Sequence, residues 1–164
     1  MINENLASLR FKEIFKLWSQ LGINQGYIAS SHAFFKHTRD KNLKILTLEF
    51  IQCLKEENKQ LTLLLKENGV LAPTASIEYG KMKITDIRGK SFINDGEISA
   101  ILSMNIASSL IAVSQALELA VKKTHLTKYG ELHMRYALLG AKLIDLSKSK
   151  GWLLASTQKE ASVL

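Results

Sequence analysis

The sequence is poor in residues that interrupt helices or cross-link chains. Its 164 residues include one proline, Pro73, and one cysteine, Cys53. Proline is the residue that most strongly breaks a helix, so its near absence favours long uninterrupted helices. A single cysteine excludes an internal disulfide and fits a reducing compartment. The first residues lack the apolar core of a secretion signal, so we expect a cytoplasmic protein.

The sequence also lacks the common signatures of catalysis. It has no Gly-rich phosphate loop, nucleophile elbow or zinc-ligand spacing. A two-metal site in a helical bundle needs Glu-x-x-His on two helices, because that spacing puts both ligands on one helix face. The residues three positions after the candidate glutamates are not histidines: Gln52 after Glu49, Val121 after Glu118, and Met134 after Glu131. We therefore expect no catalytic residues, no metal ligands and no cofactor.

The chain carries a formal net charge of +7. Such a charge could indicate a nucleic-acid or membrane-surface partner. The lysines and arginines, however, are spread along the whole chain, and no DNA- or RNA-binding motif accompanies them. We expect solvated helix faces and no nucleic-acid partner. Binding to an acidic polymer stays an alternative, which steeply salt-dependent association would reveal.

One long segment, from Ile98 to Leu117, contains no charged residue. Its length fits a membrane span. It also contains many polar residues, too many for lipid unless they find partners: Ser99, Ser103, Asn105, Ser108, Ser109, Ser114 and Gln115. We expect a helix buried on nearly all sides rather than an integral membrane segment. Its small residues would permit close helix contact, within one bundle or across a dimer interface.

Apolar periodicity predicts four helices, at about residues 8–38, 41–68, 94–123 and 127–150. The expected core face of the first helix is an alternating three- and four-residue series: Phe11, Ile14, Trp18, Leu21, Gln25, Ile28, His32 and Phe35. The expected core face of the second helix is Leu43, Leu46, Phe50, Cys53 or Leu54, Leu61, and Leu64 or Leu65. That of the fourth helix is Tyr129, Leu132, Tyr136, Leu139, Leu143 and Leu146.

Helix-end signals support these boundaries. Asp40 can cap the second helix, and Gly69 can end it in a left-handed conformation. Asn94 and Glu97 form a capping-box pattern before the third helix. Gly151 would end the fourth, and Trp152 to Leu154 would fold back onto the bundle. Gly22 and Gly26 lie inside the first helix, where they would allow close helix approach or mark a kink.

Residues 69–94 contain Pro73 and show no helical period, although residues 77–87 could form an extended segment or a hairpin. So long a loop is unusual in a compact domain. A crossover that joins two antiparallel helix hairpins explains it, as in ferritin-like topology. The sequence thus predicts an all-α fold: a single ferritin-like four-helix bundle domain over residues 1–164, with its crossover at about residues 69–94.

A few polar residues could lie inside such a bundle. His32 shares the expected core face of the first helix with Gln25, and Glu57 is a further candidate from the second helix. Together they could bind a small molecule or a metal ion. A histidine in this setting is more often hydrogen-bonded within the core. Cys53 lies on or beside an apolar face, where a thiol is inert.

Short motifs along nearly the whole chain carry a family resemblance. They are Leu9-x-x-x-Glu13-Ile14-x-x-Leu17-Trp18, Phe34-Phe35-Lys36-His37-x-x-Asp40 followed by Leu43-Lys44, Gly69 with Pro73, Phe92-x-x-Asp95, and Leu146-Ser147-Lys148-x-Lys150-Gly151-Trp152. In these the chain resembles an uncharacterised ferritin-like family of spore-forming bacteria, whose members are often labelled spore-coat or coat-like proteins. The resemblance implies no catalytic residues.

The chain departs from that family in two respects. Many members carry an Arg-Pro-Pro-type segment after the last helix, where this chain has Leu153-Leu154-Ala155-Ser156. Many also contain two tandem bundle units, whereas this chain contains one. The second departure leaves open whether two chains pair to rebuild the double unit.

The sequence and the resemblance together lead to two functional hypotheses. The first is a non-enzymatic structural or interaction protein, associated with the spore coat, which forms a homodimer through its long apolar helices or binds other coat proteins. The alternative is a ferritin-like small-molecule or metal-binding protein, conceivably an enzyme, that uses His32, Gln25 and Glu57 inside the bundle.

Overall fold

A computed structural model describes residues 2–72, 93–120 and 122–153, with side chains from residue 11 onward. It contains four helices: α1 (Ile2–His37), α2 (Lys41–Glu67), α3 (Asp95–Leu119) and α4 (Lys123–Ser149). The described residues include no strand, so the predicted all-α class is confirmed. The segment at residues 77–87 and the tail after residue 155 lie outside the described residues.

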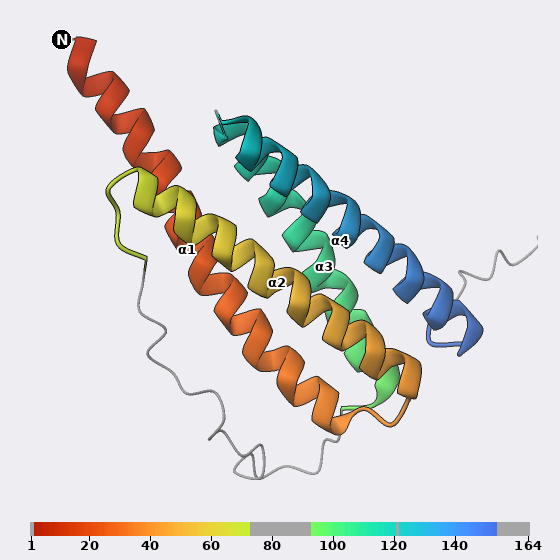
Figure 1. Cartoon of the computed structure of the whole chain (residues 1–164). Coiled ribbons are helices and arrows are strands. Elements are labelled where there is room, and N and C mark those ends of the chain that lie inside the picture. The colour runs from red at the N-terminus through yellow and green to blue at the C-terminus, as the bar shows by residue number, and fades with distance from the viewer. Residues whose placement is uncertain (1, 73–92, 121, 154–164) are drawn as a thin grey trace, which may run out of the picture.

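The helices form two antiparallel hairpins, α1 with α2 and α3 with α4 (Figure 1). The hairpins join chiefly where α2 packs on α4. Asp95, the first residue of α3, accepts hydrogen bonds from the turn between α1 and α2, so α2 and α3 begin at the same end of the bundle. These two helices therefore run parallel, so α2 ends and α3 begins at opposite ends of the bundle. This arrangement agrees with the predicted crossover.

Local signals in the sequence fix most helix ends. Asp40 Oδ1 accepts hydrogen bonds from the backbone N–H of Asn42 and Leu43, at 2.9 and 3.0 Å, and so caps α2. Asn94 and Glu97 form the predicted capping box before α3. Gly69 and Gly151 follow α2 and α4 with φ of 74° and 69°, the left-handed region that favours glycine.

The junction between α3 and α4 differs from the expectation. Helix α3 ends at Leu119 rather than near residue 123, and α4 begins at Lys123 rather than near Thr127. The N-cap residue of α4, Lys122, makes no side-chain capping bond, so the sequence holds no start signal there. Thr127, which looked like a start residue, instead donates from Oγ1 to the carbonyl of Lys123 within the helix, at 3.0 Å.

The core runs along the axis of the bundle. The predicted faces of α2 and α4 are confirmed, and their fully buried members include Leu43, Phe50, Leu54, Leu65, Tyr129, Tyr136 and Leu143. Trp152 packs against this core after the turn that ends α4, and its ring lies beside Gly96 of α3. Leu153 is exposed, so only part of the predicted fold-back is observed.

The core face of α1 is rotated only slightly from the predicted one, since Ile14, Leu21 and Ile28 pack in the core as predicted. Leu17, Asn24 and Ser31 are buried, whereas Trp18 is 41% exposed and Phe11 69% exposed. Phe11, Phe15 and Trp18 instead stack in a row along the outside of the helix. They lie toward the N-terminal end of α1, which extends beyond the other helices (Figure 1). Apolar residues surround α1 here, so their periodicity alone could not select the face.

Helix α3 is buried on one face, not on nearly all sides. Ile98, Leu102 and Val113 face the core, while Met104 is 70% exposed and Ile111 62% exposed. Among the described helices, α3 alone is long and apolar enough to span a membrane, a test that core helices of soluble proteins also pass. The sequence predicted that this helix is uncharged and suited to close helix contact, but it did not predict how much of the helix faces outward.

Candidate functional site

A buried carboxyl group lies at the centre of the bundle. Glu57 of α2 is 1% exposed, and its Oε2 accepts a hydrogen bond of 2.6 Å from Tyr136 Oη of α4, a side chain that is also fully buried. Asn24 of α1 approaches the same carboxyl, and Ser109 of α3 lies beside the phenol. We call these four residues the central polar cluster. Every helix of the bundle contributes one residue to it.

Helical periodicity explains why Glu57 points inward. It follows Cys53 by four residues and precedes Leu61 by four, and both of these are buried. Residues four apart lie on one helix face, so the carboxylate is on the core face of α2. Tyr136 occupies the core stripe of α4 in the same way, seven residues after Tyr129.

The environment of Glu57 favours its neutral form. Burial raises the pKa of this carboxyl, because the charged form loses its hydration. The hydrogen bond from Tyr136 and the approach of Asn24 lower the pKa and offset only part of that rise. Burial, together with the adjacent Glu57, raises the pKa of Tyr136 far above its ordinary value. Neither group can therefore ionise easily in the folded protein.

Asn24 Nδ2 and Ser109 Oγ make no hydrogen bond of good geometry with the described residues. Each still lies close enough to its neighbour in the cluster, Asn24 to Glu57 and Ser109 to Tyr136, to lower the pKa of that neighbour as a hydrogen-bond partner. The other end of the Asn24 amide is satisfied, since its Oδ1 accepts from Gln20 Nε2 at 2.8 Å. This contact fixes the amide with its NH₂ group turned away from Gln20.

The three residues predicted as an interior site do not come together. Glu57 is buried as described, but His32 is exposed on α1, so its predicted interior position is wrong. Partial burial, Lys55 and Lys36 lower the pKa of His32, which makes it neutral at ordinary pH. Gln25 is half-buried in an open groove between α1 and α2. The rotation of α1 puts Asn24, one residue earlier, where Gln25 was expected.

The described residues contain no group of three or more His, Cys, Asp or Glu side chains that could hold a metal ion. The partners of Glu57 are a phenol and an amide, with a hydroxyl group beyond the phenol. Cys53, one turn away, has a pKa that burial raises, so its thiol stays protonated and unreactive. The chemistry available at this centre is hydrogen bonding.

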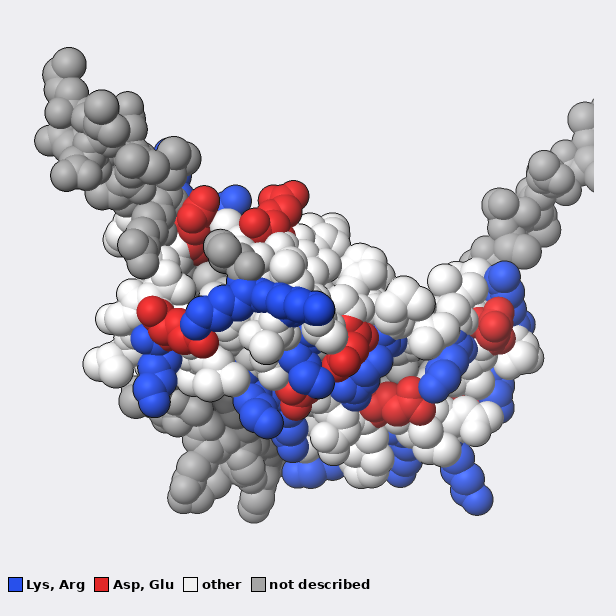
Figure 2. Space-filling view, turned by 45° about the horizontal axis from the view of Figure 1, so that its top comes forward, with Lys and Arg blue, Asp and Glu red and all other residues white. Residues whose placement is uncertain are grey.

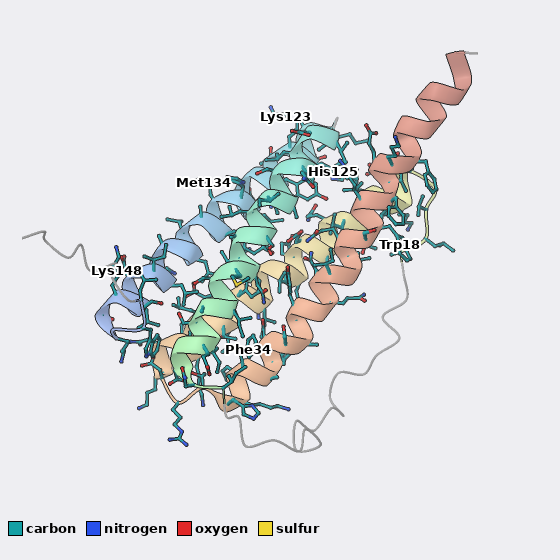
Figure 3. The ribbon with its side chains drawn as sticks, turned by 180° about the vertical axis from the view of Figure 1, so that it is seen from behind. Trp18, Phe34, Lys123, His125, Met134 and Lys148 are labelled. Atoms are coloured by element: carbon teal, nitrogen blue, oxygen red, sulfur yellow. The ribbon has the colours of Figure 1, made fainter. Side chains whose placement is uncertain are left out.

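A second feature lies on the surface. The outer α3/α4 face consists of exposed apolar residues on two helices that pack against each other: Met104 and Ile111 of α3, and Met134, Leu138 and Ile144 of α4. Met134 points away from the core (Figure 3). Exposed alanines lie among these residues, namely Ala100, Ala107, Ala137 and Ala141. Single exposed apolar residues are ordinary, but a group on adjacent helices indicates an interaction surface.

On the face shown in Figure 2, the charged side chains of the described residues show no comparable grouping by sign. Lys and Arg are interspersed there with Asp and Glu. Several form ion pairs across helices, such as Lys142 with Glu49 at 2.9 Å and Lys150 with Asp40 at 2.7 Å. This distribution differs from the one-sided basic surface typical of nucleic-acid-binding domains.

The fold and its inert interior define a helical bundle protein without a recognisable reaction centre among the described residues. The chain belongs to the family described as "Protein of unknown function (DUF3231)", which matches residues 2–158. It is 31% identical over 146 residues to the uncharacterised protein YvdQ of Bacillus subtilis strain 168, covering 89% of this chain and 86% of that protein.

A solved relative supports the same assignment. The crystal structure of a "putative spore coat protein" from Bacillus halodurans C-125 is 36% identical, with a TM-score of 0.75. The match covers 88% of this chain and 91% of that chain. The resemblance seen in the sequence, to an uncharacterised family with spore-coat members, is thereby confirmed. The relatives carry no assigned enzymatic activity in their names.

Proposed function

We propose that the protein is a non-enzymatic structural protein of the spore coat, and that it self-associates through the outer α3/α4 face. The observation that carries the proposal is this face: Met104 and Ile111 on α3 are exposed, as is Met134 on α4, and the two helices pack against each other. Exposing these side chains to water is unfavourable, by about 25 cal/mol for each Å² of apolar surface. A partner that covers them would recover that free energy.

Charge favours a second copy as the partner. Two chains that each carry +7 repel one another, so they can approach closely only where charge is absent. Helix α3 has no charged residue from Ile98 to Leu117. Lys142 of α4 is turned to Glu49 of α2, and Lys128 is paired with Glu131 on its own helix. A twofold dimer centred on α3 would therefore match one uncharged helix with its equal, and would leave the exposed Arg135 and Asp145 of α4 outside the contact.

The small residues on the same surface favour helix-to-helix contact. Ala100, Ala107, Ala137 and Ala141 are all exposed and lie between the larger apolar side chains. Small side chains let two helix backbones approach, while Met and Ile fill the space on either side. The spore-coat setting rests on the relative named above, and a coat layer is an assembly in which a self-associating bundle has an evident use.

The inner contacts of α3 favour a soluble protein over a membrane protein. Ser99 Oγ and Ser147 Oγ share a hydrogen bond of 2.7 Å, and Ser114 Oγ lies 3.2 Å from His133 Nδ1. Helix α4 supplies hydrogen-bond partners for these polar groups, so they need no partner outside the bundle. We expect purification without detergent and no retention on DNA columns at ordinary salt.

Light scattering coupled to size-exclusion chromatography tests the proposal. We expect the native chain to be a dimer at micromolar concentration and Ile111→Glu to be a monomer, because the substitution places like charges at the interface. Ile45→Glu is the matched control, since Ile45 is also exposed but lies on α2. It should remain dimeric. A native monomer, or an unchanged dimer of Ile111→Glu, would contradict the proposal.

The central polar cluster gives one reason to consider a second function, the binding of a metal ion or small molecule inside the bundle. Glu57 is a buried carboxyl with polar neighbours from three other helices. Elemental analysis of the purified protein separates the two functions. Iron, manganese or zinc in stoichiometric amount would favour the second one.

A further inference from the structure

The aromatic row of α1, formed by Phe11, Phe15 and Trp18, faces solvent. Its side chains are between 41% and 69% exposed. The ring of Phe15 stacks on those of Phe11 and Trp18, with centroids 6.3 and 6.4 Å apart and interplanar angles of 17° and 18°. The row lies toward the end of α1 that extends beyond the other helices (Figure 1). Exposed apolar groups of this kind mark interaction surfaces.

The same stripe of α1 continues into small residues. Gly22, Gly26 and Ala29 follow Trp18 at steps of four, four and three residues, so they lie on the same face of the helix. Both glycines are exposed, and a Cβ atom on either would meet nothing within 4 Å. Glycine inside a helix is less stable than alanine, and no contact within the described part of the chain uses the space that these two leave. The stripe therefore has a bulky half, the aromatic row, and a flat half.

Two copies of this stripe fit each other when they lie antiparallel. If a twofold axis passes at the level of Gln20, each residue of one α1 faces the residue equally far on the other side of Gln20 in its partner. The facing pairs are then Trp18 with Gly22, Phe11 with Ala29 and, within one residue, Phe15 with Gly26. Each ring would meet a flat part of the partner helix, and the steps of three and four residues are those of left-handed helix packing.

Charge does not oppose this contact. Helix α1 contains no Lys, Arg, Asp or Glu from Leu17 to Phe35. Two chains that each carry +7 can therefore approach here without placing like charges at the centre of the contact. Lys12 and Lys16 follow Phe11 and Phe15 by one residue, so they lie beside the stripe and not within it.

The area available suits a specific but weak contact. A covered aromatic side chain buries about 150–250 Å², so the exposed parts of six rings amount to about 600–700 Å². The rings would cover a similar area of the facing helices. The total, about 1,300 Å², is at the lower end of the range of about 1,200–2,000 Å² for specific interfaces. We expect this contact to form only above micromolar concentration.

We propose that the outer stripe of α1 is a second self-association surface, on which two copies pair antiparallel so that the aromatic row of each covers the flat half of the other. The inference deepens the proposed function and rests on it for its consequence. Chains that pair through the outer α3/α4 face and again through α1 can assemble beyond a dimer, as a coat layer requires. The α1 contact itself does not need the other face.

Sedimentation velocity from micromolar to millimolar concentration tests the α1 contact. In the Ile111→Glu chain, which removes the outer α3/α4 contact, we expect a monomer that becomes a dimer as concentration rises. Adding Trp18→Glu should weaken that dimer at least tenfold. Ile23→Glu is the matched control, since Ile23 is 46% exposed on the same helix but lies about 100° around it from Gly22. It should leave the dimer unchanged.

A size swap tests the pairing of Trp18 with Gly22. Gly22→Trp alone sets two rings against each other, and Trp18→Ala alone removes the ring, so both should weaken the dimer. The double variant Trp18→Ala/Gly22→Trp exchanges the bulky and flat positions and should recover it. Circular dichroism checks that each variant is folded, as we expect because the space beside Gly22 is open.

Several results would overturn the proposal. They are an Ile111→Glu chain that stays monomeric at millimolar concentration, equal weakening by Ile23→Glu, and a double variant that associates no better than the single ones. Another is unchanged association of Trp18→Glu with loss of binding to phosphatidylglycerol vesicles, which would assign the row to a lipid surface. Failure of the proposed α3/α4 contact looks different, because Ile111→Glu would then leave native association unchanged while Trp18→Glu still lowered it.

Discussion

Tyr136 donates its hydroxyl hydrogen to Glu57 Oε2 at 2.6 Å, and this bond connects two residues that lie 79 positions apart in the chain. Both side chains are fully buried. The bond lies where α2 and α4 join the two hairpins. Its removal should affect the pairing of the hairpins more than the helices themselves.

Substituting the two core tyrosines of α4 should separate a bonded hydroxyl from an unbonded one. Tyr136→Phe leaves the Glu57 carboxyl buried without its donor and should lower the free energy of unfolding by about 1–3 kcal/mol. Tyr129 Oη has no partner among the described residues, so Tyr129→Phe should be neutral or stabilise by up to about 1 kcal/mol. Urea denaturation measures both values. Equal losses of unfolding free energy in the two variants would show that the Tyr136–Glu57 bond contributes no more to stability than the unbonded hydroxyl of Tyr129.

The stability of the protein should depend on pH through Glu57. Burial raises the pKa of this carboxyl above 4.5, so the folded state binds a proton that the unfolded state releases. The contribution is fully present below pH 4.5 and is lost as pH rises through the folded pKa. Glu57→Gln keeps the shape of the neutral acid and removes its titration. We expect the variant to gain stability relative to the native chain as pH rises.

Denaturant titrations of both proteins from pH 4 to pH 8 measure this difference. The quantity to compare is the difference between the two free energies of unfolding at each pH, because surface groups then cancel. A difference that stays constant over the whole range would show that Glu57 does not change its protonation on folding, and one that shifts the other way would show a lowered pKa.

Asp95 should contribute more to the stability of the folded protein than an ordinary surface carboxylate does. It accepts from Thr38 Oγ1 at 2.6 Å and from the backbone N–H of Arg39 and Asp40 at 3.1 and 3.0 Å. Asp95→Ala leaves these donors without their acceptor and should cost about 2 kcal/mol. Glu49→Ala, which breaks only an exposed pair with Lys142, should cost less than about 1 kcal/mol. Thermal unfolding of both variants checks the order, and a larger loss for Glu49→Ala would refute it.

Two glycines of α1 should be replaceable with a gain. A Cβ atom at Gly22 or Gly26 would meet no other atom within 4 Å, so neither permits a close approach within the chain. Alanine at either position should add about 0.5–1 kcal/mol through helix propensity. Gly69→Ala should instead destabilise, because φ there is 74°. Chemical denaturation of the three variants measures whether each substitution raises or lowers the free energy of unfolding. A loss for Gly22→Ala would indicate a partner packed on that side of α1.

The parts of this fold that the sequence revealed are those with a strong local cause. Asp40, Asn94 and Glu97 act through atoms a few residues away, so their roles could be inferred without the fold. The core faces of α2 and α4 were predictable because most charged residues of those helices lie outside one regular apolar stripe. The junction of α3 and α4 was not, because Lys122 makes no capping bond.

The candidate site depended on tertiary packing and was found only in part. Glu57 was a candidate, but its partners Asn24, Ser109 and Tyr136 come from three other helices and share no spacing in the sequence. The rotation of α1 brought Asn24 to the core in place of Gln25, and left His32 outside. The position of Glu57, four residues after Cys53 and four before Leu61 of the apolar stripe, was the available sequence signal that a polar centre exists.

The parallel course of α2 and α3 has a consequence for how fast the protein folds. Contacts within each hairpin are close in sequence and can form early, since local contacts cost little chain entropy. Contacts between the hairpins, such as that of Glu57 with Tyr136, must await the closure of a much longer loop. We expect the docking of two preformed hairpins to set the folding rate, so that substitutions at the α2–α4 interface slow refolding, while those inside a hairpin that is already formed at that step leave the unfolding rate nearly unchanged.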